Sequence, residues 1–401
     1  MTADNETLSC PFDFSEDLDF DPTFASLMRR SSPARIRLPY GDADAWLITG
    51  FDAVKQVTTD QRFSRAGIIG RDYPRMTPEP IVSPESINVM DPPQSSRVRH
   101  LASQAFTQQQ VDRMRPRIVQ LADRLLDDME EQGPPADVVE HLSDKLPRHA
   151  VLDLLGIDRG EWTWIQDSVH QLLVIGAENK EGATKAKSDL VGYFAELAGQ
   201  RRTSPGPDLI SAMAAAQEGD EHLDDRELAV MTLTLALSGQ DTATCQISNI
   251  VYLLLTRPVL LQHLRSRPEA LTDALHEMLR CIPFRKGVGI PRVALEDVEL
   301  DGAHIRAGDF VHVSYLTANR DPERYPDPHV IDLDRQSAPH MTFGWGGHRC
   351  IAVPLAMAEL EVAIGRLLER FPRIRLAVGP QEVRWDTKTI RRFPLELPVA
   401  W

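Results

Sequence analysis

The fold of this chain is decided by the stretch Phe343-Gly344-Trp345-Gly346-Gly347-His348-Arg349-Cys350. It places a cysteine at the end of a loop that contains three glycines. Glycine lacks a Cβ atom, so such a loop turns tightly and approaches a flat group closely. Its backbone N–H groups can point at the sulfur and moderate the charge of a thiolate, as outer donors do at metal sites. A buried structural cysteine beside a glycine-rich turn is the alternative, and residues outside the loop decide between the two.

A helix is expected directly after this loop, over residues 353–370. Pro354 falls in its first turn, where proline is favoured. The positive end of that helix faces Cys350, which stabilises a thiolate by about 0.3–1 kcal/mol.

A second landmark is the apolar segment of residues 228–255, which is long enough to span a bilayer. Its middle is polar, and an ionised aspartate there is costly in lipid. We therefore expect a helix through the centre of a globular domain. Within it, Asp241 beside Thr242 places an acid next to an alcohol, a pair suited to proton delivery. The alternative is that Thr242 bonds back to its own helix and Asp241 faces water.

These motifs resemble those of the cytochrome P450 family. The glycine loop matches the haem-binding signature F-G-x-G-x-H-x-C at every fixed position. Residues 238–242 are similar to the pattern Ala/Gly-Gly-x-Asp/Glu-Thr of the family's central helix, with Ser238 in place of the usual first residue. The resemblance covers about residues 52–397, nearly the whole chain.

The resemblance implies a mainly α fold with a small β portion and haem b as the cofactor. Cys350 is then the thiolate ligand of the iron, which favours cleavage of a bound O–O bond. Phe343, Gly344 and Gly346 form part of the cofactor-binding loop. Gly239 leaves room for O2 over the iron, and Asp241 with Thr242 supplies the protons.

A third match is Glu277-Met278-Leu279-Arg280, which resembles the E-x-x-R element of the family. Residues three apart lie on one helical face, so Glu277 and Arg280 are neighbours. The resemblance implies that both bond to the segment before the cysteine loop, through Asn319 or Arg320. We assign Glu277 and Arg280 to folding and haem retention and not to chemistry.

Haem carries two carboxylates, and the resemblance implies that Arg99, Arg292 and His348 meet them. Arginine suits this task because its planar fork bonds both oxygens of a carboxylate. Arg99 lies in a segment similar to the motif D-P-P-x-H-x-x-x-R, in which Ser95 stands where the motif has histidine. One carboxylate donor is therefore weaker or missing, and we expect Arg99 to take more of that contact.

The family's substrate walls correspond to residues 63–90, 233–243 and 284–290, a late turn at 389–393, and residues 169–175. Their mixture of glycine, basic and hydroxyl side chains predicts a substrate with hydrogen-bonding groups. The candidate pocket residues are Arg65, Ser238, Val288, Gly289 and Phe393.

The 401 residues contain no linker or internal repeat, so we expect one domain over residues 1–401, with about residues 1–20 as a flexible N-terminal segment. Short strand-like runs gather near residues 46–48 and 293–313. The length is sufficient to bury an extensive core and a cofactor.

The net charge of −15, from 59 acidic and 44 basic residues, disfavours nucleic acid as a partner. The N-terminus lacks a cationic start followed by an apolar run, so no signal peptide or membrane anchor is expected. The four cysteines have no metal-knuckle spacing. These features predict a cytoplasmic protein without a membrane partner, and we expect a monomer.

The sequence is similar to actinobacterial members of the family that tailor natural products. The resemblance implies C–H hydroxylation or oxidative coupling of a small substrate, for which a tryptophan-containing cyclodipeptide (diketopiperazine) is one candidate. Hydroxylation of a macrolide, polyketide or terpenoid is the alternative, and a non-catalytic haem sensor is the alternative of a different class. Electrons from NAD(P)H would arrive through a ferredoxin and a ferredoxin reductase, because no G-x-G-x-x-G nucleotide-binding unit is found. Arg349, His100 and Arg113 are candidates for docking an acidic carrier.

Overall fold

The computed structural model describes residues 7–10, 17–30, 32–218, 221–335 and 339–401. The helices are α1 Pro22–Met28, α2 Phe51–Thr59, α3 Gln94–Ser103, α4 Gln108–Gln132, α5 Lys145–Leu154, α6 Trp162–Leu173, α7 Lys180–Thr203, α8 Leu209–Ala215, α9 Asp225–Thr256, α10 Pro258–Ser266, α11 Leu271–Cys281, α12 Tyr315–Ala318 and α13 Val353–Arg370. The strands are β1 Leu8–Ser9, β2 Ala34–Arg37, β3 Ala45–Ile48, β4 Phe63–Ser64, β5 Ala136–Asp137, β6 Gln217–Glu218, β7 Glu221–His222, β8 Arg292–Ala294, β9 Val298–Leu300, β10 Ala303–Ile305, β11 Phe310–Val313, β12 Arg375–Leu376 and β13 Pro398–Ala400. The prediction of a mainly α fold with a small β portion is confirmed.

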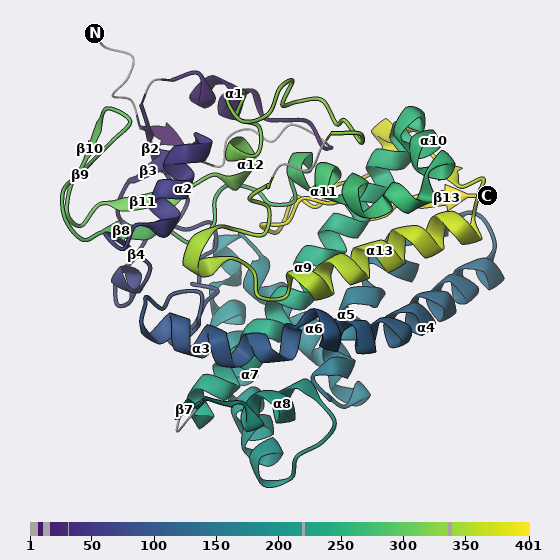
Figure 1. Cartoon of the computed structure of the whole chain (residues 1–401), viewed down its shortest axis with the longest axis horizontal. Helices are drawn as coiled ribbons and strands as arrows, with labels where there is room; N and C mark the ends of the chain where they lie inside the picture. Colours follow the sequence, from purple (N-terminus) through teal and green to yellow (C-terminus); the bar gives the residue numbers. More distant parts are fainter. Residues whose placement is uncertain (1–6, 11–16, 31, 219–220, 336–338) are drawn as a thin grey trace.

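Helix α9 runs through the centre of the molecule and packs against α5, α7 and α13 (Figure 1). It begins with a reciprocal cap: the Glu227 N–H donates to the Asp224 carboxylate at 2.7 Å, and the Asp224 N–H donates to the Glu227 carboxylate at 3.1 Å. Between Glu227 and Leu254 almost every side chain is buried. A helix that is buried on nearly all sides belongs in a core, which confirms the predicted central helix.

The main sheet lies at one side of the helices, on the left of Figure 1, with strand order β1-β2-β3-β11-β8-β4. β11 pairs with β3 in parallel, from Phe310 opposite Ala45 to Val313 opposite Ile48. β8 is antiparallel to β11 and places Arg292 opposite Val311. The predicted strand regions near residues 46–48 and 293–313 are thus neighbours in one sheet, and this sheet positions Arg292.

The expectation of a flexible segment over residues 1–20 is wrong for residues 7–10 and 17–20. Strand β1 pairs in parallel with β2, and Cys10 and Leu18 are buried. The Arg392 side chain donates to the backbone carbonyl of Asp17 at 2.8 Å. Backbone pairing and apolar burial therefore hold this acidic segment, and residues 1–6 and 11–16 lie outside the described residues.

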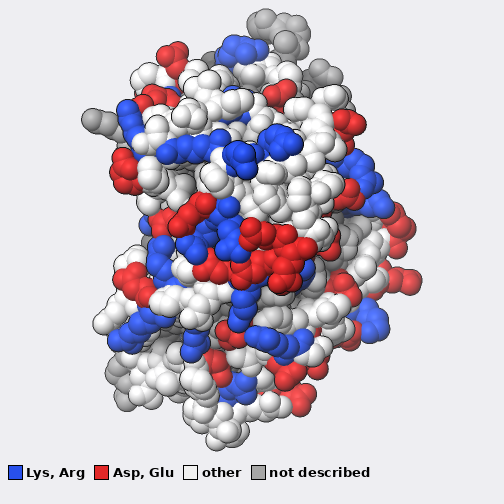
Figure 2. All heavy atoms as spheres, turned by 90° about the vertical axis from the view of Figure 1, so that its right-hand side faces the viewer, with Lys and Arg blue, Asp and Glu red and all other residues white. Residues whose placement is uncertain are grey.

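Helices α4 and α13 run side by side and are joined by arginine–carboxylate pairs. Arg115 meets Glu361 at 2.5 Å, and Arg366 meets Asp123 at 2.6 Å. Figure 2 shows the side of the molecule where both helices end, with acidic and basic side chains intermixed. Such exposed pairs contribute little individually, so the contact of these helices depends mainly on their apolar faces.

Within the described residues, no single helix has both the length and the apolar character to cross a membrane. Helices α9 and α10 meet these criteria only when taken together, and they bend by 101° at their junction.

Candidate active site

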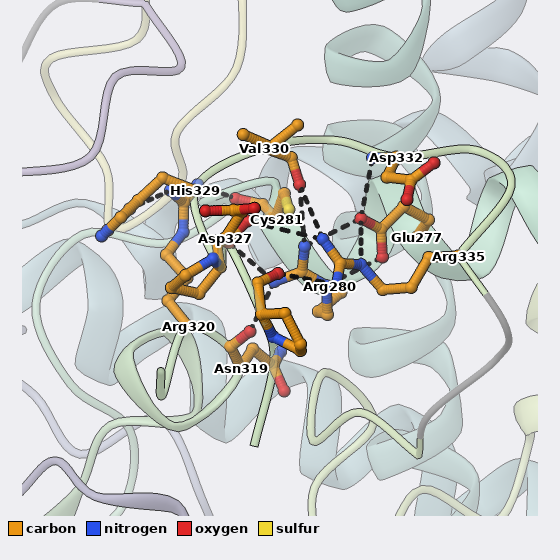
Figure 3. Close-up of polar contacts among 12 residues, drawn as sticks. Glu277, Arg280, Cys281, Asn319, Arg320, Asp327, His329, Val330, Asp332 and Arg335 are labelled. Carbon is orange, nitrogen blue, oxygen red and sulfur yellow. Dashed lines mark hydrogen bonds and ion pairs between the residues drawn. The ribbon is translucent and has the colours of Figure 1, made fainter. Parts of the chain in front are cut away.

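Glu277 and Arg280 form a buried ion pair on α11, and Arg280 uses its whole guanidinium group. Its Nε and Nη2 each donate to the Glu277 carboxylate at 2.8 Å. Nη1 donates to the Asn319 and Pro328 carbonyls, and Nη2 also donates to the Val330 carbonyl. Figure 3 shows Arg280 between Glu277 and these carbonyls. The predicted contacts of the pair with the segment before the cysteine loop are present.

The Glu277 carboxylate is kept charged by its partners. Burial raises the pKa of Glu277, but hydrogen bonds from Arg280, the Asp332 N–H and Arg335 outweigh burial, so its pKa is lowered overall. A buried carboxylate that accepts several hydrogen bonds retains its charge. The pair therefore fixes the segment of residues 319–335 onto α11.

The Asn319 side chain connects this hydrogen-bond network to the residues that precede the cysteine loop. Its side-chain carbonyl accepts the Met341 N–H at 2.6 Å, and its amide donates to the Thr342 hydroxyl at 2.9 Å. Thr342 in turn donates to the Leu279 carbonyl of α11 at 2.8 Å. Residues 341–342, which directly precede the loop, are therefore held by the same network as Arg280.

The cysteine loop is closed by the Cys350 N–H, which donates to the Phe343 carbonyl at 2.7 Å. Gly344 and Gly346 have φ angles of +77° and +66°, which side chains rarely adopt. A Cβ atom on Gly346 would lie 2.3 Å from the Thr58 carbonyl oxygen. Gly346 is therefore required by close packing on α2, whereas the sequence suggested only close approach to a flat group.

The Cys350 side chain, at the end of the glycine loop, is exposed. Burial by the surrounding protein raises the pKa of its thiol, while the Ala352 N–H, Arg99 and Arg349 act to lower it. A sulfur that is accessible and yet desolvated lies in a recess. The start of α13 at Val353 and the two arginines supply the positive environment that a thiolate ligand needs.

Arg65, Arg292 and His348 lie near one another and carry buried side-chain nitrogens that have no hydrogen-bond partner among the described residues. Arg292 is 1% exposed, and both of its Nη atoms lack a hydrogen-bond partner among the described residues. The same holds for Arg65 Nε and His348 Nδ1. Burial and neighbouring Arg292 lower the pKa of Arg65 to about 9, and burial together with Arg65, Arg292 and Arg99 lowers the pKa of His348.

These orphaned donors fit the two carboxylates of a haem. Buried charges in native proteins are almost always paired, so a cluster of unpaired donors indicates a binding site for an anionic group. Arg292 and His348, which the resemblance assigned to the haem carboxylates, both belong to this cluster. Arg65 was predicted to line the substrate pocket, but the structure groups it with Arg292, because β4 pairs with β8 and brings the two arginines together.

Tyr315, the first residue of α12, belongs to the same cluster and was not singled out from the sequence. Its hydroxyl is buried, has no hydrogen-bond partner among the described residues, and lies 3.8 Å from the position of a Cβ on Gly344. No sequence signal marked it, since Tyr315 follows a strand in a segment that matched the family in general.

Asp91, in the segment that resembles D-P-P-x-H-x-x-x-R, holds the backbone of Arg65. The Asp91 carboxylate accepts the Arg65 N–H at 2.9 Å and also binds the Ser64 hydroxyl. Ser95 is buried in the first turn of α3. Arg99 donates to the Arg349 carbonyl and lies near Cys350, so it supports the cysteine loop as well as the cationic cluster.

Helix α9 presents one accessible stripe. Between Glu227 and Leu254, the residues that are not buried are Thr234, Leu237, Ser238, Gly239 and Thr242. Thr234, Ser238 and Thr242 are four residues apart and share one face. The Thr242 hydroxyl donates to the Ser238 carbonyl at 2.9 Å, and the Thr234 hydroxyl lies 3.2 Å from the Ser86 hydroxyl.

Gly239 was predicted to leave room for O2, and in the structure the position of its missing side chain faces α5. A Cβ on Gly239 would lie 2.8 Å from Cγ2 of Val151, a buried residue of α5. Residue 239 is rotated by about 100° from residue 238 on the helix, so it faces α5 while Ser238 and Thr242 face the accessible side. Gly239 permits the close packing of α5 on α9.

The Asp241 carboxylate does not meet the Thr242 hydroxyl in this structure. It lies 3.4 Å from Arg391 Nη1 and borders a cavity of ≈ 370 Å³ together with Gln240, Thr244, His170 and Phe393. Burial raises the pKa of Asp241, which Arg391 and Arg285 partly counteract. Asp241 therefore borders a cavity on a different side of α9 from Thr242, and its part in proton delivery stays a prediction.

The segments predicted to form substrate walls are joined by backbone hydrogen bonds. The Ile390 N–H donates to the Leu173 carbonyl at 3.0 Å, and the Lys286 N–H donates to the Ile390 carbonyl at 2.8 Å. A Cβ on Gly287 would lie 2.6 Å from the Met76 sulfur, so residues 63–90 also meet residues 284–290. All five predicted segments thus contact at least one other.

The remaining pocket candidates differ in their surroundings. Ser238 and Gly289 are exposed, and Val288 is half-buried. Nothing lies within 4 Å of the position of a Cβ on Gly289, which leaves open space there. Phe393 is buried beside the Asp241 cavity, with the Arg391 guanidinium 4.9 Å above its ring, and so lies on the other side of α9 from Ser238.

Comparison with known proteins agrees with this geometry. The family model described as Cytochrome P450 matches residues 170–382. The chain belongs to the cytochrome P450 family. Nocardicin C N-oxygenase of Nocardia uniformis subsp. tsuyamanensis is 42% identical over 397 residues, which cover 99% of each chain. Mycinamicin IV hydroxylase/epoxidase of Micromonospora griseorubida is 38% identical over 400 residues, also 99% of each chain.

A solved structure described as cytochrome P450mel 107F1 with biaryl coupling reactivity is 53% identical to this chain, with a TM-score of 0.97. The match covers 99% of this chain and 100% of that one. This cytochrome P450 is therefore a haem-dependent oxidoreductase of secondary-metabolite tailoring. It uses O2 and electrons from NAD(P)H delivered by redox partners, and the alternative of a non-catalytic haem sensor is not supported.

Exchange of Gly239 for alanine tests the packing role of this glycine. Overpacking against Val151 costs about 1–3 kcal/mol, from which the better helix propensity of alanine subtracts about 1 kcal/mol. We expect Gly239→Ala to lower the free energy of unfolding of the parent protein. In the Val151→Ala background, in which the contact has been removed, we expect Gly239→Ala to be tolerated. Denaturant unfolding of the four members of this double-mutant cycle measures the coupling. Additive effects would contradict the contact.

Loss of the Arg280 guanidinium group should destabilise the haem-binding core. Arg280→Gln leaves Glu277 buried with fewer partners and removes the bonds to the Asn319 and Pro328 carbonyls, so we expect a loss of about 3–5 kcal/mol. Denaturant unfolding and the haem content of the purified protein measure the effect. Arg335→Gln, which removes an outer partner of Glu277, serves as the milder control. Equal losses in the two variants would refute the central place of Arg280.

Proposed function

We propose that this cytochrome P450 couples two aromatic units of a small natural product, with hydroxylation of the same substrate as a competing outcome. The observation that carries the proposal is the similarity over the full chain to the structure with biaryl coupling reactivity. The accessible hydroxyl stripe of α9 supports a substrate that carries hydrogen-bonding groups, as phenols and amides do. A tryptophan-containing cyclodipeptide stays a prediction within this class.

Coupling and insertion differ in their atom balance. In coupling, two aryl C–H bonds break and one C–C bond forms. O2 takes up the two hydrogen atoms lost by the substrates, the equivalent of one hydride from NAD(P)H and one proton, and leaves as two molecules of water. In hydroxylation, one oxygen atom enters the product and the other leaves as water. The haem supplies O2 activation in both cases, and the protein decides which substrate atoms are presented.

The protein's part in proton delivery falls to Asp241 and Thr242. Burial raises the pKa of Asp241, so this carboxyl group holds a proton more readily than an exposed one. For Asp241 to serve Thr242, its carboxyl group has to turn away from Arg391, which lies 3.4 Å away. The cavity that Asp241 borders offers space for water on its other side.

The site of electron delivery is proposed on the side of the cysteine loop. Arg349, His100 and Arg113 are exposed and lie on the cysteine loop, α3 and α4, respectively. Positive charge steers an acidic carrier and raises its association rate. The ferredoxin, its reductase, the cytoplasmic location and the monomeric state stay predictions.

A second candidate function is hydroxylation of a macrolide. It is favoured by the 38% identity to mycinamicin IV hydroxylase/epoxidase over nearly all of both chains. A macrolide makes mainly apolar contacts, so this function predicts little effect from removal of the hydroxyl of Ser238.

The mass of the product decides between these functions. The purified protein is incubated with a ferredoxin, its reductase, NAD(P)H and panels of phenolic aromatics, cyclodipeptides and macrolactones. We expect a product that joins two substrate units and has lost two hydrogens. A Cys350→Ser variant is the control for oxidation by the partners alone. A macrolactone that gains one oxygen, with aromatics left unchanged, would replace the first proposal with the second.

Ser238→Ala tests the polar contact with substrate. A lost hydrogen bond corresponds to roughly a five-fold weaker binding of an aromatic substrate, measured by the haem spectral shift on titration. Ser238→Thr keeps the hydroxyl and is the matched control. Identical affinities in the alanine and parent proteins would place the hydroxyl outside the substrate contact.

A further inference from the structure

The cationic cluster beside the cysteine loop contains one donor that carries no charge. Tyr315 lies among Arg65, Arg292 and His348, and its phenol oxygen is buried without a hydrogen-bond partner among the described residues. A buried hydroxyl without a partner costs free energy, so native proteins rarely keep one without a reason. The neighbouring Arg65 guanidinium can donate to the phenol oxygen, but an arginine offers no acceptor, so the hydroxyl proton of Tyr315 is left without one among these neighbours.

The backbone holds the phenol group in this place. The Ser314 N–H donates to the Ile48 carbonyl of β3 at 2.9 Å, and the Ser314 hydroxyl accepts the Thr317 N–H at 3.2 Å and so caps α12. Tyr315 therefore leaves the sheet at a fixed point, directly after β11. The phenol reaches the turn at Gly344, where a Cβ would lie 3.8 Å from its oxygen.

Compared with the related motif, this chain lacks a hydrogen-bond donor for the haem carboxylates at position 95. Ser95 stands where the related motif has histidine, and its short side chain is buried at the start of α3. Arg99, which was expected to take over, donates to the Arg349 carbonyl and lies beside Cys350. The two carboxylates of a haem offer four oxygens, so a missing donor leaves one of them less well satisfied.

We propose that Tyr315 donates a hydrogen bond to a haem carboxylate and takes the place of the histidine that is absent at position 95. A neutral donor suits this position better than another cation. Arg65 and Arg292 already repel each other there, and a third full charge would add to the repulsion. The phenol contributes a hydrogen bond to a charged acceptor, which is among the stronger hydrogen bonds in proteins.

The test measures how firmly the holoenzyme holds its haem. Tyr315→Phe removes only the hydroxyl, and haem release is followed by transfer to excess apomyoglobin. We expect release about ten-fold faster than from the parent, since a hydrogen bond to a charged group has this magnitude. The reduction potential of the iron should fall as well, because a less satisfied carboxylate favours the ferric state.

A rescue experiment separates this role from a merely structural one. Ser95→His in the Tyr315→Phe background returns a donor to the position where the motif has it, and we expect slow haem release to return. Tyr252→Phe is the control, because the Tyr252 hydroxyl has a protein partner in Asp17. Release from Tyr315→Phe at the parental rate, or fast release that Ser95→His leaves unchanged, overturns the proposal.

Discussion

The guanidinium group of Arg280 is the contact on which the site depends. The Arg280 side chain is among the largest fully buried side chains of the described residues. Its hydrogen bonds go to Glu277 and to three backbone carbonyls. A buried cation tolerates little displacement, because each lost bond exposes a charge to an apolar interior. The Asn319 side chain extends this order to Met341 and Thr342, and from there the chain enters the cysteine loop.

Much of this architecture was predictable because the relevant signals are local. Helix α13 spans Val353–Arg370, as its proline and apolar pattern indicated, and α9 contains the predicted central segment. Glu277 and Arg280 form the predicted pair, since their spacing fixes one helical face, and their role in haem retention stays a prediction. The resemblance implied that Gly239 leaves room for O2, but it gave no sign that the missing side chain of Gly239 faces Val151.

The sequence could not predict which distant residues meet. Arg65 joins Arg292 only because β4 pairs with β8, and Tyr315 reaches the cysteine loop only because β11 lies between β3 and β8. Asp241 meets Arg391, 150 positions along the chain, through a turn that has no periodic pattern. Such contacts depend on sheet order and loop course, which neither composition nor local motifs specify. The segments predicted to form the substrate walls could be named from the sequence, but the distribution of their side chains between the two sides of α9 could not.

The short parallel pairing of β1 with β2 has a practical meaning for anyone who shortens this protein. Leu8 and Ser9 cover one edge of the six-stranded sheet, and Cys10 is buried immediately behind them. Removal of these residues leaves the N–H and C=O groups of β2 open along that edge, and an open edge is a template on which other chains can align and aggregate. A truncated version intended for crystallisation should therefore keep Leu8–Ser9, even though helices make up most of the fold.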